Sequence, residues 1–332
     1  AEWTWARMAG MSETDTAVSD VNAVEHGPEQ HDVPKGGRSG FNIVDGRQVH
    51  YLEWGSSVAP AVLAMHGGGQ TAYMFEDIGA NLRDNRHVIA IDLPGHGESE
   101  SIPSTEGVSR QEIAATVPGV LDEFGVRPVA IIGASLGGIV AMTLAAARPE
   151  LVSAIILIDV GHRLEPEGVA RIIEFMTKHE SFGTLEEAGA AIAEYLPNRK
   201  PSPPERLKRN LRQRPDGRWV WKHSLGRISR ERMENIRDTD WENDILVGLD
   251  AEAATIQIPV LVLRGASSDV LSSDGATEVA SILPNARVAT IASAGHLAAG
   301  DNPASTASLI REFLDEVLPT STAEVHSTTT DK

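Results

Sequence analysis

Gly133-Ala134-Ser135-Leu136-Gly137-Gly138 is the stretch of sequence that decides the fold. It joins a short apolar run at 128–132, suited to a buried strand, to a helical pattern that continues to Ala147. A serine at such a strand-to-helix turn presents its hydroxyl above the edge of a sheet, and small neighbours let the helix cross the strand closely. The Gly-x-Ser-x-Gly pattern is weak by itself, but the strand and the helix around it favour a nucleophile. Ser135 is therefore the candidate catalytic serine.

Strand and helix patterns alternate on both sides of this turn. Two strands at 41–44 and 49–54 flank Asp45-Gly46, a pair typical of a β-hairpin. Short apolar runs typical of buried strands then recur at 61–65, 87–91, 129–132, 154–158, 260–263 and 287–291. Helical patterns separate most of these runs, at 72–82, 111–124, 136–147, 274–283 and 304–317. The alternation predicts an α/β fold with a mostly parallel eight-stranded sheet and helices on both faces.

One long segment interrupts the alternation. The chain is helical and polar from 161 to 254, and because a structureless connection of that length is rare, we expect an inserted helical cap there. The core of the fold is then built from 41–160 and 255–318. The polar, aperiodic stretches 1–40 and 319–332 are expected to be disordered tails.

Composition limits the kinds of site and partner. The chain has 332 residues, a formal net charge of -18 and no cysteine. The absence of cysteine excludes disulfides, thiolate metal sites and a cysteine nucleophile. The negative charge disfavours binding to nucleic acid or to anionic membranes. Because the sequence has neither an apolar run of membrane-spanning length nor the layout of a signal peptide, we expect a cytoplasmic enzyme.

A glycine-rich loop follows the strand at 61–65. His66-Gly67-Gly68-Gly69 could supply backbone N–H groups to an oxyanion, because glycine lets the backbone approach a substrate closely. One donor is expected from Leu136, the residue after the serine, and a second from Gly68 or Gly69. The alternative interpretation is a plain turn between a strand and a helix. His66 itself is expected to be structural.

A catalytic serine also needs a base and a carboxylate that orients the base. His296 lies in a glycine-containing loop after the strand at 287–291, and Asp269 lies in the loop after the strand at 260–263. Both loops are expected at the carboxyl edge of the sheet, beside Ser135. The predicted triad is therefore Ser135, Asp269 and His296, and serine chemistry of this kind needs neither a metal nor an organic cofactor.

Three other aspartates compete for the role of the acid. Asp159 closes the strand at 154–158 and is the main alternative to Asp269. Asp274 and Asp301 fit the role less well. We favour Asp269 over Asp159, and the sequence alone leaves both open.

Taken together, these motifs resemble the α/β-hydrolase superfamily. The resemblance covers about residues 41 to 318 apart from the insertion. It rests on these segments: His66-Gly67-Gly68-Gly69, Asp92-Leu93-Pro94-Gly95-His96-Gly97-Glu98-Ser99, Gly133-Ala134-Ser135-Leu136-Gly137, Asp269 and Ala294-Gly295-His296. In that superfamily the segment that begins at Asp92 is a structural loop, so the resemblance assigns no chemistry to Asp92 or His96. The insertion matches the position of the helical cap that roofs the substrate pocket.

The resemblance also implies a class of reaction. Epoxide hydrolases and haloalkane dehalogenases of this superfamily carry an aspartate where this chain has Ser135, so the resemblance disfavours them. It favours a carboxylesterase, with lactonases, C–C bond hydrolases and cofactor-independent perhydrolases as alternatives. Some proteins of the superfamily are ligand receptors with slow turnover, which is the alternative outside the enzymes. The layout is also similar to that of bacterial monoalkyl phthalate esterases.

The expected partner is a small-molecule ester. Apolar residues of the cap would suit an alkyl or aromatic group, and arginines would suit a carboxylate. The cap residues considered are Trp219, Trp221, Met176, Met233, Arg227 and Arg230. A monoalkyl ester of an aromatic diacid fits both features, although each residue could equally serve the packing of the cap. The sequence does not indicate an oligomeric state.

Overall fold

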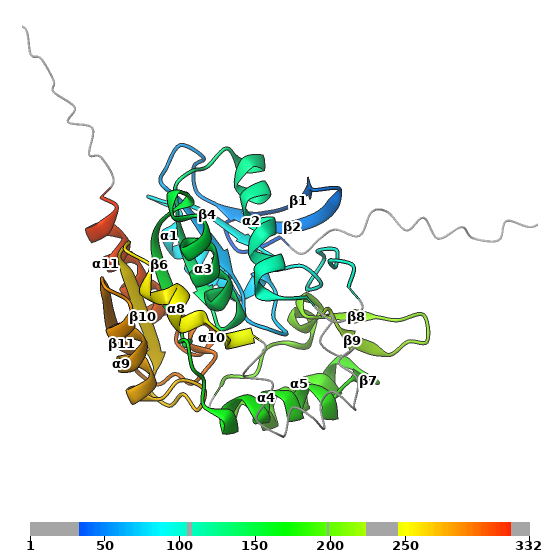
Figure 1. Ribbon diagram of the computed structural model, residues 1–332. Coiled ribbons are helices and arrows are strands. Elements are labelled where there is room, and N and C mark those ends of the chain that lie inside the picture. The colour runs from blue at the N-terminus through cyan, green and yellow to red at the C-terminus, as the bar shows by residue number, and fades with distance from the viewer. Residues whose placement is uncertain (1–32, 105–107, 198, 224–244, 320–332) are drawn as a thin grey trace, which may run out of the picture. The chain divides into compact units, whose positions relative to one another are not determined.

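The computed structural model describes residues 33–104, 108–197, 199–223 and 245–319, and its main feature is one eight-stranded sheet (Figure 1). In sequence order the strands are β1 (Arg38–Val44), β2 (Arg47–Trp54), β3 (Ala61–Met65), β4 (His87–Ile91), β5 (Val129–Ala134), β6 (Val152–Ile158), β10 (Val260–Gly265) and β11 (Ala286–Ile291). Their order across the sheet is β1-β2-β4-β3-β5-β6-β10-β11. β2 is antiparallel to both β1 and β4, and all the other neighbours are parallel. The predicted mostly parallel sheet is confirmed.

Helices cover both faces of this sheet. One face carries α2 (Arg110–Phe124), α3 (Leu136–Ala147), α8 (Leu249–Ala254) and α9 (Ser273–Ile282). The other face carries η1 (Ala72–Phe75), α1 (Glu76–Leu82), α10 (Ala298–Asp301) and α11 (Pro303–Val317). The central strands are apolar at successive positions because each face needs a partner: Ile131 packs with the first group and Ile132 with the second. Two apolar layers therefore hold the sheet, as the continuous apolar runs predicted.

Local signals in the sequence explain where α2 starts and ends. The side chain of Ser109 accepts a hydrogen bond from the backbone of Glu112, and the Glu112 side chain accepts one from the backbone of Ser109. This reciprocal capping box satisfies two amides that the helix leaves without partners. Gly125 ends the helix at a φ of 63°, a left-handed conformation that glycine adopts without a steric penalty.

The inserted segment contains a small sheet as well as helices. Its elements are α4 (Pro166–Lys178), β7 (Ser181–Phe182), α5 (Leu185–Tyr195), η3 (Pro204–Arg209), β8 (Leu211–Gln213) and β9 (Trp219–Trp221). The strands pair in the antiparallel order β7-β9-β8. The segment that was expected to be helical therefore contains a short antiparallel sheet as well. Asp216-Gly217, with a φ of 80° at the glycine, allows a tight turn between β8 and β9, and the Trp-Val-Trp of β9 favours a strand.

The end of the inserted segment also differs from the expected boundary at 254. α8 contacts α3 and α9, and its buried residues Leu249 and Ala253 pack in the core on that face of the sheet. The α/β layers therefore resume before residue 255.

The expected N-terminal tail spans 1–40. Residues 1–32 of it lie outside the described residues, and β1 already begins at Arg38. In the described parts of the chain no helix has the length and apolar character needed to cross a membrane.

Candidate active site

Ser135 stands at the turn between β5 and α3, as predicted. Its φ of 47° and ψ of -115° are strained for a residue with a side chain, which is the backbone conformation expected of a nucleophile at this turn. The glycines around it are required by close packing, since a Cβ on Gly137 would lie 2.1 Å from the carbonyl oxygen of Met65. The backbone N–H of Ser135 donates to the carbonyl of Ile158, at 3.1 Å. This bond ties the serine to the end of the neighbouring strand β6.

His296 is oriented by the residue that follows that strand. The Nδ1 atom of His296 lies 2.8 Å from Oδ2 of Asp159, whose side chain is fully buried. Two more groups donate to the same carboxylate: the backbone N–H of Gly265 at 2.8 Å and the hydroxyl of Ser268 at 2.5 Å. These three hydrogen bonds fix the buried carboxylate in place beside the imidazole.

In the described part of the chain no hydrogen bond or ion pair joins Asp269 to His296, and its predicted role as the orienting acid is therefore wrong: Asp159 holds the imidazole. Its carboxylate forms an ion pair with Arg171 of α4, with Nη1 and Oδ2 2.6 Å apart, and its side chain is 39% exposed. The reason is the number of residues between the strand and the aspartate: β10 ends at Gly265, and Asp269 comes four residues later in the loop. The loop that was expected to supply the acid instead supplies the Gly265 and Ser268 donors to Asp159.

Asp274 and Asp301, the two weaker candidates for the acid, lie at other positions. Asp274 lies in the first turn of α9. The carboxylate of Asp301 accepts a hydrogen bond from the backbone N–H of Gly295 at 3.0 Å and lies near Arg199. Asp301 therefore holds the loop before His296, whereas Asp159 contacts the imidazole.

Three of the amides in the first turn of α3 have partners. Those of Gly138 and Ile139 donate to the carbonyl of Ser135, and that of Gly137 donates to the carbonyl of His66. The amide of Leu136 makes no hydrogen bond to any residue of the described ranges. The bond from Gly137 also holds the loop that contains Gly68 and Gly69 against the start of α3.

His66 is buried and structural in this arrangement. Its Nδ1 lies 2.8 Å from the carbonyl oxygen of Gly67, and its Nε2 accepts a hydrogen bond from the backbone N–H of Leu93 at 2.9 Å. Burial lowers the pKa of His66, which keeps the imidazole neutral. The side chain thus links the glycine loop to the loop that follows β4. Within the described ranges, no group of three or more His, Asp or Glu side chains is placed to hold a metal ion.

The inserted segment reaches the glycine loop. A Cβ on Gly69, whose φ is 74°, would lie 2.3 Å from the terminal methyl of Met176 in α4 and 3.7 Å from the ring of His223. Next to it, the backbone N–H of Gly97 donates to the carbonyl of Lys222, and the ammonium of Lys222 pairs with Glu98. Residues of the inserted segment therefore form one wall beside the candidate oxyanion loop.

The two tryptophans considered for the pocket pack within the inserted segment, and Trp221 also stacks on His223, with ring centroids 5.9 Å apart. Trp219 and Trp221 contact the small core of the inserted segment, and the indole N–H of Trp221 donates to the carbonyl of His179 at 2.7 Å. Arg227, Arg230 and Met233 lie outside the described residues. Met176 is the considered residue that the structure brings to the glycine loop.

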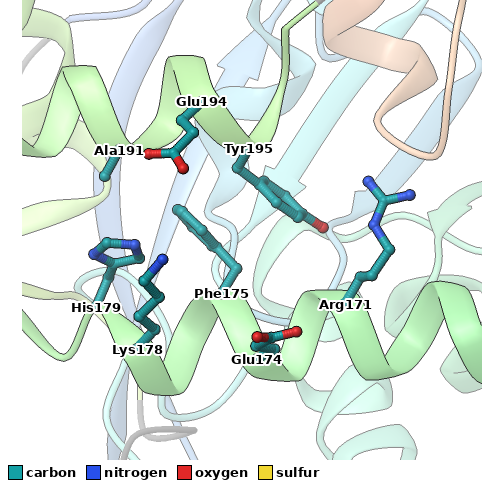
Figure 2. A pocket seen from close by; sticks show the side chains of 8 residues that line it. All are labelled: Arg171, Glu174, Phe175, Lys178, His179, Ala191, Glu194 and Tyr195. Atoms are coloured by element: carbon teal, nitrogen blue, oxygen red, sulfur yellow. The ribbon is translucent and has the colours of Figure 1, made fainter.

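A cavity of about 240 Å³ opens between α4 and α5, apart from Ser135 (Figure 2). Phe175 and Tyr195 point toward one another there and stack, with ring centroids 4.3 Å apart. Burial, helped by the nearby carboxylate of Asp269, raises the pKa of Tyr195 to about 12. Because neither Ser135 nor His296 lines this cavity, it is not the space in which the serine would meet a substrate.

Comparison with known proteins agrees with this architecture. A family model described as alpha/beta hydrolase fold matches residues 60–303. The chain is 27% identical over 278 residues to the esterase Rv0045c of Mycobacterium tuberculosis, covering 80% of this chain and 86% of that protein. It is 23% identical over 283 residues to the sn-1-specific diacylglycerol lipase ABHD11 of Mus musculus, covering 82% and 84%.

The same fold is found among solved structures. The crystal structure of E-2-(acetamidomethylene)succinate hydrolase superposes with a TM-score of 0.70 at 24% identity, covering 84% of this chain and 99% of the other. At that level of identity the likeness concerns the fold. The family match includes β3, the turn at Ser135 and the loop of His296. The chain belongs to the alpha/beta hydrolase fold family.

Proposed function

We propose that this protein hydrolyses carboxylic esters through an acyl-enzyme on Ser135, with His296 as the base and Asp159 as the orienting acid. The observation that carries the proposal is the hydrogen bond between His296 Nδ1 and the buried Asp159 carboxylate, beside a serine held at a strained strand-to-helix turn. The likeness to proteins named as an esterase and as a lipase supports the same class of reaction.

The hydrogen-bond pattern gives each group a role in proton transfer. With the Asp159 carboxylate as the acceptor of this bond, the Nδ1 atom of His296 carries the proton and the Nε2 atom can take one. Nε2 removes the proton of the Ser135 hydroxyl as its oxygen attacks the ester carbonyl, and Asp159 stabilises the imidazolium that forms. The alcohol leaves with that proton. Water, activated by the same imidazole, then releases the acid and restores Ser135.

In the described structure no hydrogen bond joins Ser135 to His296. Bonds between a nucleophile and its base are often long before substrate binds and tighten in the complex. Ser135 follows β5 and His296 follows β11, so both lie at the carboxyl edge of the sheet, and the His296–Asp159 pair holds the imidazole there.

Backbone amides would hold the oxyanion. The backbone N–H of Leu136 is the first candidate. Leu136 begins α3 directly after the nucleophile, and its N–H donates to no residue of the described ranges. Gly68 or Gly69 would supply the second, on the loop that Gly137 fastens to α3. Loss of one such donor typically raises the barrier by about 3 kcal/mol.

The proposed substrate class is a monoalkyl ester of an aromatic diacid. A monoalkyl ester of an aromatic diacid needs a cation for the free carboxylate, and the two arginines considered for it lie outside the described residues. Of the described arginines of the inserted segment, Arg171 is paired with Asp269 and Arg209 with Glu76. A lactone, a C–C bond substrate or a slowly hydrolysed signal ligand would use the same triad.

A series of p-nitrophenyl esters of increasing chain length tests the proposal, with Ser135→Ala and Ser267→Ala measured in parallel. We expect rapid turnover by the parent chain, loss of nearly all turnover in Ser135→Ala, and no change in Ser267→Ala, because Ser267 is exposed. Turnover that survives in Ser135→Ala would contradict the proposal. A single slow turnover by the parent chain would favour the receptor instead. Adding monoalkyl phthalates to the series tests the narrower substrate class.

A further inference from the structure

A second Ser–His–Asp arrangement lies at the β1 edge of the sheet. His50 Nε2 lies 2.9 Å from the hydroxyl oxygen of Ser39, and His50 Nδ1 lies 2.7 Å from Oδ2 of Asp92. None of these three residues takes part in the mechanism built around Ser135. The contacts follow the order of a catalytic triad, with the hydroxyl at Nε2 and the carboxylate at Nδ1.

The positions of the protons follow from the partners of Asp92. Its two oxygens also accept hydrogen bonds from the backbone N–H groups of Ala72 at 2.7 Å and Glu98 at 3.0 Å. Burial by itself would raise the pKa of Asp92, but the hydrogen bonds that it accepts from His50 and from the backbone of Ala72 help to hold that pKa below its usual range. The ionised carboxylate can only accept, so His50 donates from Nδ1 and Nε2 receives the hydrogen of the Ser39 hydroxyl.

The strand register and two aromatic rings fix the imidazole in this position. Phe41 pairs with His50 and Ser39 with Leu52, so Ser39 and His50 are diagonal neighbours on one face of the β1–β2 ribbon. The ring of His50 contacts those of Phe41 and Tyr73, with centroids 5.1 Å and 6.1 Å away. His50 is 1% exposed, whereas Ser39 is half-buried on a strand at the edge of the sheet.

We propose that Ser39 is a second nucleophilic serine, which His50 and Asp92 activate toward reactive carboxylic esters and their phosphonate analogues. The Ser39 oxygen bonds to the acyl carbon, and His50 Nε2 takes the hydroxyl proton. The bond to the leaving oxygen breaks, and the leaving group departs with that proton as the free alcohol. The product is an acyl ester on Ser39.

The surroundings of Ser39 distinguish this reaction from turnover. Ser39 lies inside a regular strand, whereas Ser135 stands at the start of a helix whose first amide can face an oxyanion. Without that stabilisation, hydrolysis of the acyl-serine is slow, so the reaction modifies the protein once.

A fluorophosphonate probe on the full-length Ser135→Ala chain tests the proposal without depending on the function of Ser135. Mass spectrometry of peptides measures the rate of labelling at each serine. We expect Ser39 to be labelled at least about tenfold faster than the exposed Ser56 and Ser57, because general-base assistance is worth about 10²-fold or more. Equal rates at Ser39 and at the two exposed serines would overturn the proposal.

A second variant separates activation from mere accessibility. His50→Gln in the Ser135→Ala chain should lower the labelling of Ser39 to the rate of the exposed serines, because an amide cannot take up the proton. The same His50→Gln substitution in the chain that retains Ser135 should leave the labelling of Ser135 unchanged, which shows that the fold is intact. Fast labelling of Ser39 in a folded His50→Gln chain would overturn the role of His50.

Discussion

Asp159 and Asp269 follow neighbouring parallel strands, yet only Asp159 reaches the imidazole of His296. Asp159 comes directly after β6, is fully buried, and accepts three hydrogen bonds. Asp269 comes four residues after the end of β10, is partly exposed, and pairs with Arg171 of the inserted segment. The two carboxylates therefore have different partners although chain order would admit either as the acid.

The difference teaches that strand adjacency and loop length decide which carboxylate orients the base. β6 lies next to β5, and the backbone bond from Ser135 to Ile158 brings the residue after Ile158 to the serine. The loop after β10 extends toward α4, where the carbonyl of Asp269 leaves no room for a Cβ on Gly168. Asp269 therefore contacts the inserted segment through both its carboxylate and its backbone carbonyl, and substitutions at Asp159 and Asp269 should separate this contact from catalysis.

The largest effect is expected from Asp159→Asn. The amide keeps the shape but cannot stabilise the imidazolium, and it favours the wrong tautomer of His296. We expect kcat on a p-nitrophenyl ester to fall by about 10³- to 10⁴-fold, as is typical when the acid of a triad is lost. Asp269→Asn is the matched control and should change kcat by less than about threefold. A larger loss in Asp269→Asn than in Asp159→Asn would assign the acid to Asp269 after all.

A smaller fall in kcat is expected from Ser268→Ala, which compares two neighbouring serines of the loop after β10. The hydroxyl of Ser268 donates to Asp159 and accepts from the backbone N–H groups of Val270 and Leu271. Its loss removes one bond to a charged group, worth about 1.5 kcal/mol, so kcat should fall roughly tenfold. Ser267→Ala, at the exposed neighbouring position, should leave kcat unchanged. An unchanged kcat in Ser268→Ala would show that the Ser268 hydroxyl has no part in positioning Asp159.

The fold could be predicted from the sequence because its signals are local. Buried parallel strands are continuous apolar runs, and the observed strands begin and end within a few residues of those runs. The sheet of the inserted segment was missed because β7, β8 and β9 are only two or three residues long. Such short strands show no clear alternation of apolar and polar residues.

The candidate site was predictable only in part. Ser135 and His296 carry glycine-rich local motifs, whereas an acid has none and depends on which strands are neighbours. An aspartate immediately after a fully apolar strand is a signal that favours Asp159, since a short connection keeps the side chain at the sheet edge. The contact of His50 with Ser39 and Asp92 had no such signal, because it joins residues 11 and 42 positions apart through the strand register.

The smallest effect, on the free energy of unfolding, is expected from breaking the ion pair between Arg171 and Asp269. Their side chains are 58% and 39% exposed, so water screens the attraction and the long arginine side chain loses conformational freedom. A double-mutant cycle of Arg171→Ala and Asp269→Asn, measured by urea unfolding, should give a coupling of at most about 1 kcal/mol. kcat should stay within about threefold of the parent value in all three variants. A coupling of several kcal/mol would mean that the pair is buried in solution, whereas a shared large loss of kcat would tie the ion pair to the chemistry at Ser135.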